Sequence, residues 1–165
     1  MAAREVRLLG DPVLRRAAKP VAEITDDTRA LVADMFETMY AEDGVGLAAP
    51  QVGIGERVIV VDPREEEGRG FALINPVILE RSAETDRAEE GCLSIPGLKE
   101  IVERPARVVV EGLDAQGHPV RIDAADLLGR ILQHEIDHLD GVLFLDRVSP
   151  LKRKLLIDRW KKIRP

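Results

Sequence analysis

Three segments with helical spacing of apolar residues constrain the fold more than any other feature of the sequence. They cover residues 25–42, 124–139 and 149–163. Each starts at a residue suited to cap a helix, namely Thr25 or Asp26, Asp123, and Ser149. A fold built from parallel βαβ units would alternate helices and strands regularly, and these helices do not alternate in that way. The order therefore predicts an α+β protein with mostly antiparallel sheet.

Apolar segments between the first two helices predict the strands. We expect a buried strand at 57–62, an extended pair at 71–82 broken at Asn75-Pro76, and a hairpin at 106–123 with Gly117 near its turn. Residues 43–55 hold four glycines and one proline, which excludes a regular helix there. Residues 64–70, REEEGRG, read as a solvated turn.

Length and charge narrow the class of protein. The 165 residues fit one domain, and the net charge of −6 argues against a nucleic-acid binder that works by overall attraction. The N-terminal residues lack an apolar core of signal-peptide length, and no apolar run approaches the roughly 18 residues of a membrane span. We expect a cytoplasmic protein that does not bind membranes.

The stretch QHEIDH contains His134, Glu135 and His138, the spacing with which a helix presents two imidazoles to one metal ion. Leu127 and Ile131 continue the same stripe, which places the histidines on a buried face. A metal lowers the pKa of bound water to roughly 7, and an adjacent carboxylate such as Glu135 can take and pass on the proton. The alternative is a solvated helix that matches a loose pattern by chance.

A catalytic metal site needs a third protein ligand, and the sequence leaves its identity open. One protease class places a third histidine six residues after the second, where this chain has Phe144. Another class uses an acid from a following helix, for which Asp158 is the candidate, although a solvated acid on the helix face is the easier explanation. Upstream lies the single cysteine, Cys92, whose thiolate would suit a catalytic site with an open fourth position. Spacing alone does not choose Cys92 over a carboxylate, and a lone cysteine is often a small buried apolar residue. The one other histidine of the sequence, His118, lies in the expected hairpin turn and should be exposed.

Three motifs in order resemble the signatures of the peptide deformylases. They are GVGLAAPQ (44–51), EGCLS (90–94) and QHEIDH (133–138), and the similarity extends to DMFETMYAEDGVGLAAPQVG, LINP and SPLK. It covers nearly the whole chain. The resemblance implies an enzyme that removes the N-formyl group from the N-terminal methionine of newly synthesised polypeptides.

The resemblance also implies a role for each motif residue. Cys92, His134 and His138 would bind one divalent metal ion, usually Fe(II) in the family, with zinc, nickel or cobalt also accepted. Glu135 would act as general base and then general acid while metal-bound water or hydroxide attacks the formyl carbon. Gln51 and the backbone N–H of Leu93 would stabilise the oxyanion. The metal-binding helix would then lie centrally, between an N-terminal and a C-terminal helix.

The glycine-rich segment 44–53 reads either as a surface turn or as a backbone edge for a peptide. In the family the substrate adds there as a strand, which implicates Val45, Gly46 and, opposite them, Gly91. The methionine pocket would be lined by Val45, Glu90, Leu127, Arg130 and Ile131. Many relatives carry an apolar residue in place of Arg130, so this side chain either lines the pocket or sits on its rim, where it would affect the preference for residues after methionine.

Residues 149–165 carry seven Lys or Arg and one Asp. The segment reads either as a solvated helix whose Leu156, Trp160 and Ile163 pack on the body, or as a helix that docks on ribosomal RNA, as in bacterial deformylases. Formyl-methionyl nascent chains are the expected partners, and a monomer is favoured.

Two other functions compete with deformylation. One is a metallopeptidase, which Phe144 opposes. The other is a structural metal site or RNA-binding module, which would require a fourth protein ligand.

Overall fold

A computed structural model describes residues 2–66 and 68–165 and contains three α-helices and seven strands. They follow in the order α1 (Asp26–Ala41), β1 (Gly46–Ala48), β2 (Val58–Val61), β3 (Phe71–Arg81), β4 (Thr85–Gly91), β5 (Lys99–Pro105), β6 (Arg107–Leu113), β7 (Pro119–Ala125), α2 (Asp126–Leu139) and α3 (Pro150–Ile163). Every pairing between these strands is antiparallel. The predicted α+β class with mostly antiparallel sheet is confirmed.

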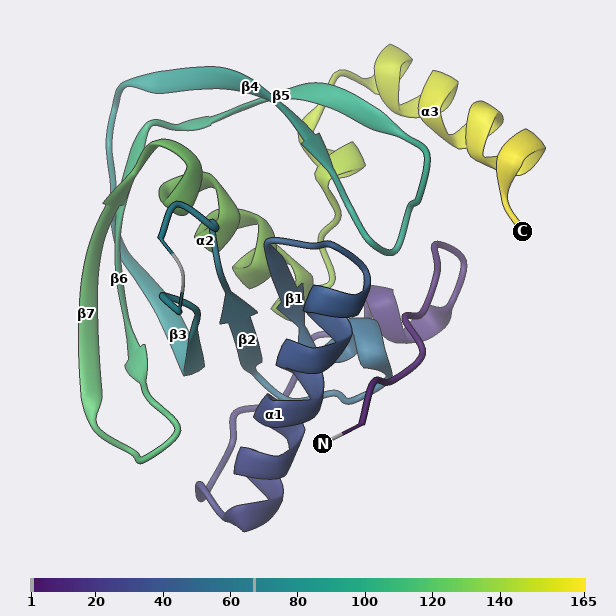
Figure 1. Cartoon of the computed structure of the whole chain (residues 1–165). Coiled ribbons are helices and arrows are strands. Elements are labelled where there is room, and N and C mark those ends of the chain that lie inside the picture. The colour runs from purple at the N-terminus through teal and green to yellow at the C-terminus, as the bar shows by residue number, and fades with distance from the viewer. Residues whose placement is uncertain (1, 67) are drawn as a thin grey trace.

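The strands form two sheets around α2, as Figure 1 shows. A five-stranded sheet has the order β1-β2-β3-β6-β7, and β4 and β5 form a separate hairpin. The side chains of β2 alternate, so that Ile59 and Val61 pack in the core with α2, while Val58 and Val60 pack in the core with α1. The sheet therefore separates two apolar cores, and α2 lies in the middle of the molecule.

A third core lies where the turn after β4, strand β5 and α3 meet. Its buried apolar residues are Ile95, Leu98, Val102, Leu143, Phe144, Leu145, Leu156 and Trp160. Within α3, Leu156 and Trp160 pack as expected, whereas Ile163 is 45% exposed and reaches toward Gly97. Part of the apolar face of α3 thus anchors the helix to the body.

Two of the three predicted helix caps are confirmed. The hydroxyl of Thr25 accepts from the backbone N–H of Thr28, and the hydroxyl of Ser149 accepts from that of Lys152. The prediction for Asp123 is wrong, because this residue lies in β7 and forms an ion pair with Arg107 on the neighbouring strand. Helix α2 starts later, after Ala125.

Two further strand predictions need correction. Residues 71–82 do not form a broken pair: β3 is one strand, whose register shifts between Ile74 and Val77. Asn75 has a φ of +53° at this shift, and its amide hydrogen-bonds the backbone of Val21 in both directions. The β4–β5 hairpin was not predicted at all.

The predicted hairpin at 106–123 is confirmed as β6 and β7, with Gly117 in its turn at a φ of +85°. His118 in this turn is exposed, as expected. Among the helices that the structure describes, none combines the length and the apolar character needed to cross a membrane.

Candidate metal centre

Helix α2 brings the two histidines together. His134 and His138 are one helical turn apart, both are buried, and their Nε2 atoms are 3.3 Å apart. The helix stops soon after them, where Gly141 takes a φ of +74°. A side chain at Gly141 would also meet the backbone oxygen of Arg15 at 2.7 Å, so the stop needs glycine.

Cys92 completes the group from a different part of the chain. It follows β4 directly, and its Sγ lies 3.4 Å from His138 Nε2. One donor atom from each of Cys92, His134 and His138 lies within 4.8 Å of the other two. Spacing alone could not identify the thiol of Cys92 as the third member of the group. The fold places it beside the two imidazoles.

The donor set fits a divalent metal ion. Ligand bonds of about 2.0–2.3 Å in a tetrahedral site separate neighbouring donors by roughly 3.3–3.8 Å. The separations of 3.3 Å between the imidazoles and 3.4 Å between Cys92 and His138 agree with that spacing. Three protein ligands would leave one position of a tetrahedral site open, as in catalytic rather than structural sites.

The competing third ligands lie elsewhere or play another part. Asp158 is half-exposed on α3, where it pairs with Lys154. Phe144 is buried, and its ring stacks on that of His134 at 6.2 Å between centroids. Phe144 stands where one protease class has a histidine, and in this chain it supports the imidazole of His134 by packing.

Glu90 orients His134. Its Oε1 lies 3.0 Å from His134 Nδ1, an arrangement in which the imidazole donates to the carboxylate and keeps Nε2 free for a metal. Arg104 donates to both oxygens of Glu90, and Arg130 donates to one of them at 2.6 Å. Burial raises the pKa of Glu90, but the hydrogen bonds from His134 and Arg104 outweigh it and lower the value to about 2. Glu90 is therefore a buried anion.

The ion network extends from Glu90 along α2. Arg104 also donates to Asp137 at 2.9 Å, and Arg147 donates to both oxygens of Asp137. These contacts tie β5 to the helix that carries the histidines. Buried charges of this kind are tolerated because each has an opposite charge in hydrogen-bonding contact.

Glu135 is buried beside the metal group. Its Oε1 has no hydrogen-bond partner among the described residues, and burial raises its pKa to about 7. Its Oε2 lies so close to the backbone of Gly46 that a Cβ there would approach it to 2.6 Å. A carboxyl group with an unpaired buried oxygen and a pKa near neutrality is suited to accept and return a proton.

Gln51 lies on the other side of Cys92 and is 1% exposed. Its Oε1 accepts from the backbone N–H of Ala48, which fixes the orientation of the amide. Its Nε2 then donates to Ser94 Oγ at 3.1 Å and points toward Cys92 Sγ at 3.6 Å. A neutral hydrogen-bond donor, the amide of Gln51, is thus held beside Cys92.

A cavity of about 360 Å³ opens next to this group. Among the residues proposed from sequence, it is lined by Val45, Gly46, Gln51, Glu90, Gly91, Cys92, Leu93, Leu127, Arg130, Ile131, His134 and Glu135. Sequence reasoning missed other lining residues, among them Asp43 and Glu89, which flank the motifs, Ile95 and Leu98 in the turn between β4 and β5, and Lys99 at the start of β5. The three motifs converge on one cavity.

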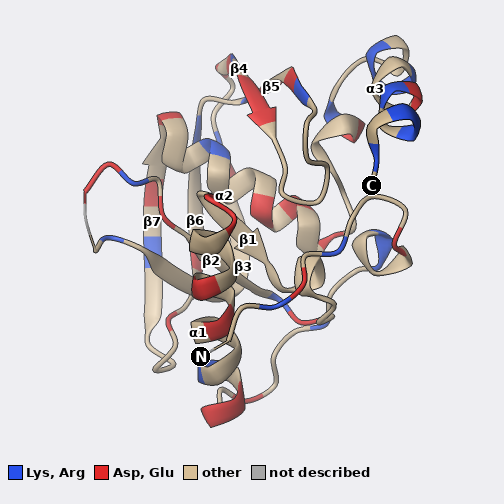
Figure 2. Ribbon diagram, turned by 45° about the vertical axis from the view of Figure 1, so that its right-hand side comes forward, with Lys and Arg blue, Asp and Glu red and all other residues tan. Residues whose placement is uncertain are grey.

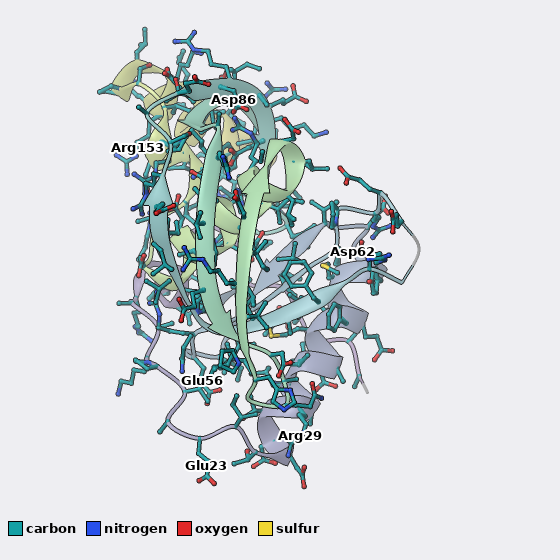
Figure 3. All side chains as sticks on the ribbon, turned by 90° about the vertical axis from the view of Figure 1, so that its left-hand side faces the viewer. Glu23, Arg29, Glu56, Asp62, Asp86 and Arg153 are labelled. Atoms are coloured by element: carbon teal, nitrogen blue, oxygen red, sulfur yellow. The ribbon has the colours of Figure 1, made fainter. Side chains whose placement is uncertain are left out.

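Of the lining residues, Leu127 differs from expectation, and for Arg130 the structure distinguishes between the two positions that the sequence left open. Leu127 was predicted to continue a buried stripe, but it is 42% exposed, because it lies in the first turn of α2 at the cavity wall. Arg130 is only 7% exposed and lines the cavity rather than its rim. Its guanidinium group is held by Glu90, by the carbonyl of Val102 and by Asp86, which Figure 3 labels at the upper end of the molecule.

Comparisons with known proteins agree over nearly the whole chain. A family model described as polypeptide deformylase matches residues 3–154. A peptide deformylase from Thermodesulfovibrio yellowstonii is 48% identical over 163 residues, which is 98% of each chain. One from Halothermothrix orenii is 51% identical over 152 residues, 92% of this chain and 97% of the relative.

Solved structures give the same result. The crystal structure of a peptide deformylase from Legionella pneumophila matches with a TM-score of 0.92 at 42% identity, over 98% of this chain and 95% of the other. That of a peptide deformylase from Synechococcus elongatus in complex with actinonin matches with a TM-score of 0.91 at 45% identity, over 96% and 88%.

Proposed function

The chain belongs to the peptide deformylase family of enzymes, and from this premise we propose that it hydrolyses the N-formyl group of the N-terminal methionine of newly synthesised polypeptides. The observation that carries the proposal is the group of Cys92, His134 and His138 beside Glu135 at the wall of the cavity. The proposed ligands are these three residues, and the proposed ion is Fe(II), with Zn(II), Ni(II) and Co(II) as alternatives. When bound, such an ion lowers the pKa of water and polarises a carbonyl group.

Glu135 is proposed to move the protons of the reaction. Its unpaired Oε1 would accept a proton from the attacking water and then deliver it to the departing amine. The pKa of about 7 supports both directions of transfer near neutral pH. Gln51 Nε2 and the backbone N–H of Leu93 would donate to the oxygen on which negative charge develops.

The substrate main chain is proposed to bind between two strand edges. β1 is the end strand of its sheet, and β4 pairs only with β5 in the described part of the chain, so each has one free edge. Gly46 and Gly91 lie on these strands and line the cavity, where the absence of side chains leaves room for a peptide backbone. The methionine side chain would enter the cavity between Val45, Leu127 and Ile131. Glu90 and Arg130 would lie beside it, with the charge of Arg130 balanced by its ion pairs with Glu90 and Asp86.

The experiment that tests this function is formate release from a formyl-Met tripeptide. The protein is purified anaerobically with Fe(II), or reconstituted with Ni(II), and Glu135→Gln with the same metal content serves as the control. We expect formate from the wild type in at least one metal form and no cleavage of the internal peptide bonds. No formate from either form would overturn the proposal, and peptide cleavage would favour the metallopeptidase instead.

We also propose that the chain acts in the cytoplasm as a monomer and forms a single catalytic domain. A single family model spans residues 3–154, which supports one catalytic domain.

The basic segment 149–165 is proposed to dock on ribosomal RNA. Lys and Arg residues recur along α3, as the blue segments of the ribbon in Figure 2 show, and Leu151 and Leu155 are exposed. Cosedimentation with ribosomes should weaken in a double variant Arg159→Glu, Lys162→Glu and with rising salt. Unchanged cosedimentation of the variant would contradict docking through this helix.

A further inference from the structure

The loop after β2 carries an arginine that the proposed mechanism does not use. Arg64 has a φ of +61°, and its backbone N–H donates to Asp62 Oδ1 at 2.8 Å. The other oxygen of Asp62, a buried residue labelled in Figure 3, accepts from the hydroxyl of Tyr40 at 2.6 Å. The guanidinium carbon of Arg64 lies 5.4 Å from the centre of the Tyr40 ring. Arg64 is therefore anchored to the end of β2 and to α1.

From this anchor the guanidinium reaches the segment that precedes β1. Nη2 donates to the carbonyl of Gly44 at 2.9 Å, and Nη1 donates to Asp43 Oδ1 at 2.9 Å. Asp43 has a φ of +57°, a conformation that residues other than glycine adopt at a cost and keep only where contacts hold them. Arg64 supplies two such contacts.

The segment held by Arg64 has little freedom to move. A Cβ at Gly44 would lie 2.8 Å from Leu93, and one at Gly46 would lie 2.6 Å from Glu135. The backbone edge of Gly44–Gly46 is thus packed against the proposed oxyanion and proton-transfer residues. A small shift of this edge would change both the cavity wall and the strand edge offered to a peptide.

We propose that Arg64 is a positioning residue that holds the backbone of residues 43–46 in the place where the substrate peptide pairs with it. The inference rests on the proposed function and deepens it. Backbone hydrogen bonds also hold the segment, from Gly44 N to Met39 O and from Asp62 N to Val45 O, so loss of the side chain should loosen the edge without unfolding the protein.

The kinetic test compares Arg64→Ala with Arg69→Ala. Arg69 lies in the same loop, is exposed and pairs only with Glu66 among the described residues, which makes it a matched control. In Arg64→Ala we expect the KM for a formyl-Met tripeptide to rise about three- to tenfold and kcat to change by less than about twofold, because a charged hydrogen bond to the binding edge is lost. Arg64→Lys should restore part of the change. Unchanged KM in Arg64→Ala, or an equal rise in Arg69→Ala, would overturn the inference.

A second measurement does not depend on activity. Hydrogen exchange of the backbone amides in residues 43–47 should become about tenfold faster in Arg64→Ala and remain unchanged in Arg69→Ala. Equal exchange in the wild type and Arg64→Ala would show that Arg64 does not hold the edge. If the wild type releases no formate while exchange changes as expected, the proposed function fails and the positioning of residues 43–46 by Arg64 stands.

Discussion

The proposed metal ligands come from two regions that the chain builds in opposite ways. Helix α2 is buried over most of its length, and its local geometry alone places His134 and His138 on one face. The β4–β5 hairpin is largely exposed, and Cys92 at its end reaches the helix only through tertiary structure. Glu90 joins the two regions, since it lies on β4, contacts His134 and is held by Arg104 of β5. The helix fixes the spacing of two proposed ligands, whereas the ion network at Glu90 holds the end of β4, which leads to the third.

The largest effect is expected from removing the proposed ligand on the hairpin side. Cys92→Ala should lose its metal and its activity, because two imidazoles alone bind a divalent ion weakly. Metal content by mass spectrometry of the purified protein measures this, with circular dichroism as the control for folding. Metal content equal to that of the wild type would remove Cys92 from the ligand set.

The next largest effect concerns the helix side. Glu135→Gln should keep the metal and lower kcat about 10²–10⁴-fold, because the amide cannot accept the proton. The two variants together separate metal binding from chemistry, because Cys92→Ala should lose the ion whereas Glu135→Gln should lose only turnover. Activity within tenfold of the wild type in Glu135→Gln would exclude its proposed role.

The contact between the two regions should have an intermediate effect. In Glu90→Gln we expect metal affinity to fall about 10–100-fold, the range typical for partners of metal ligands. We also expect the free energy of unfolding to fall by about 3 kcal/mol, because Arg104 and Arg130 lose a buried counter-charge. The neighbouring exposed Glu89→Gln is the matched control. Equal metal affinity in both variants would mean that the hairpin does not orient His134.

The smallest effect is expected from a substitution at Gly46, in the cavity wall beside the helix. A Cβ in Gly46→Ala would approach Glu135 to 2.6 Å and Ile131 to 2.9 Å, which should displace the carboxylate and lower kcat about tenfold. Gly55→Ala, where a Cβ would meet nothing within 4 Å, should behave as the wild type. A similar rate for both variants would indicate that the edge tolerates movement.

The same contrast explains what the sequence predicts well. Helices α1 and α3 have side-chain caps at Thr25 and Ser149 and recurring apolar positions, so their bounds follow from local pattern. The spacing of His134 and His138 is equally local. These features depend on residues within a few positions of one another, which is the range over which helical pattern is informative.

The hairpin is where prediction from pattern fails. The strands Thr85–Gly91 and Lys99–Pro105 carry many exposed charged residues and lack a clean alternation of apolar side chains. The resemblance assigned Glu90 to the pocket, but its contacts with His134, Arg104 and Arg130 bring together three separate segments and have no local signal. Asp123 was misassigned for the same reason, because its partner Arg107 lies across a hairpin.

The central claim is that one ion joins the hairpin to the helix through one sulfur and two imidazoles. X-ray absorption of the nickel- or zinc-loaded protein tests it most directly. We predict one sulfur neighbour at about 2.3 Å and two imidazole nitrogens at about 2.0–2.1 Å, with the sulfur signal lost in any metal that Cys92→Ala retains. A spectrum of the wild type with nitrogen and oxygen neighbours alone would contradict the claim.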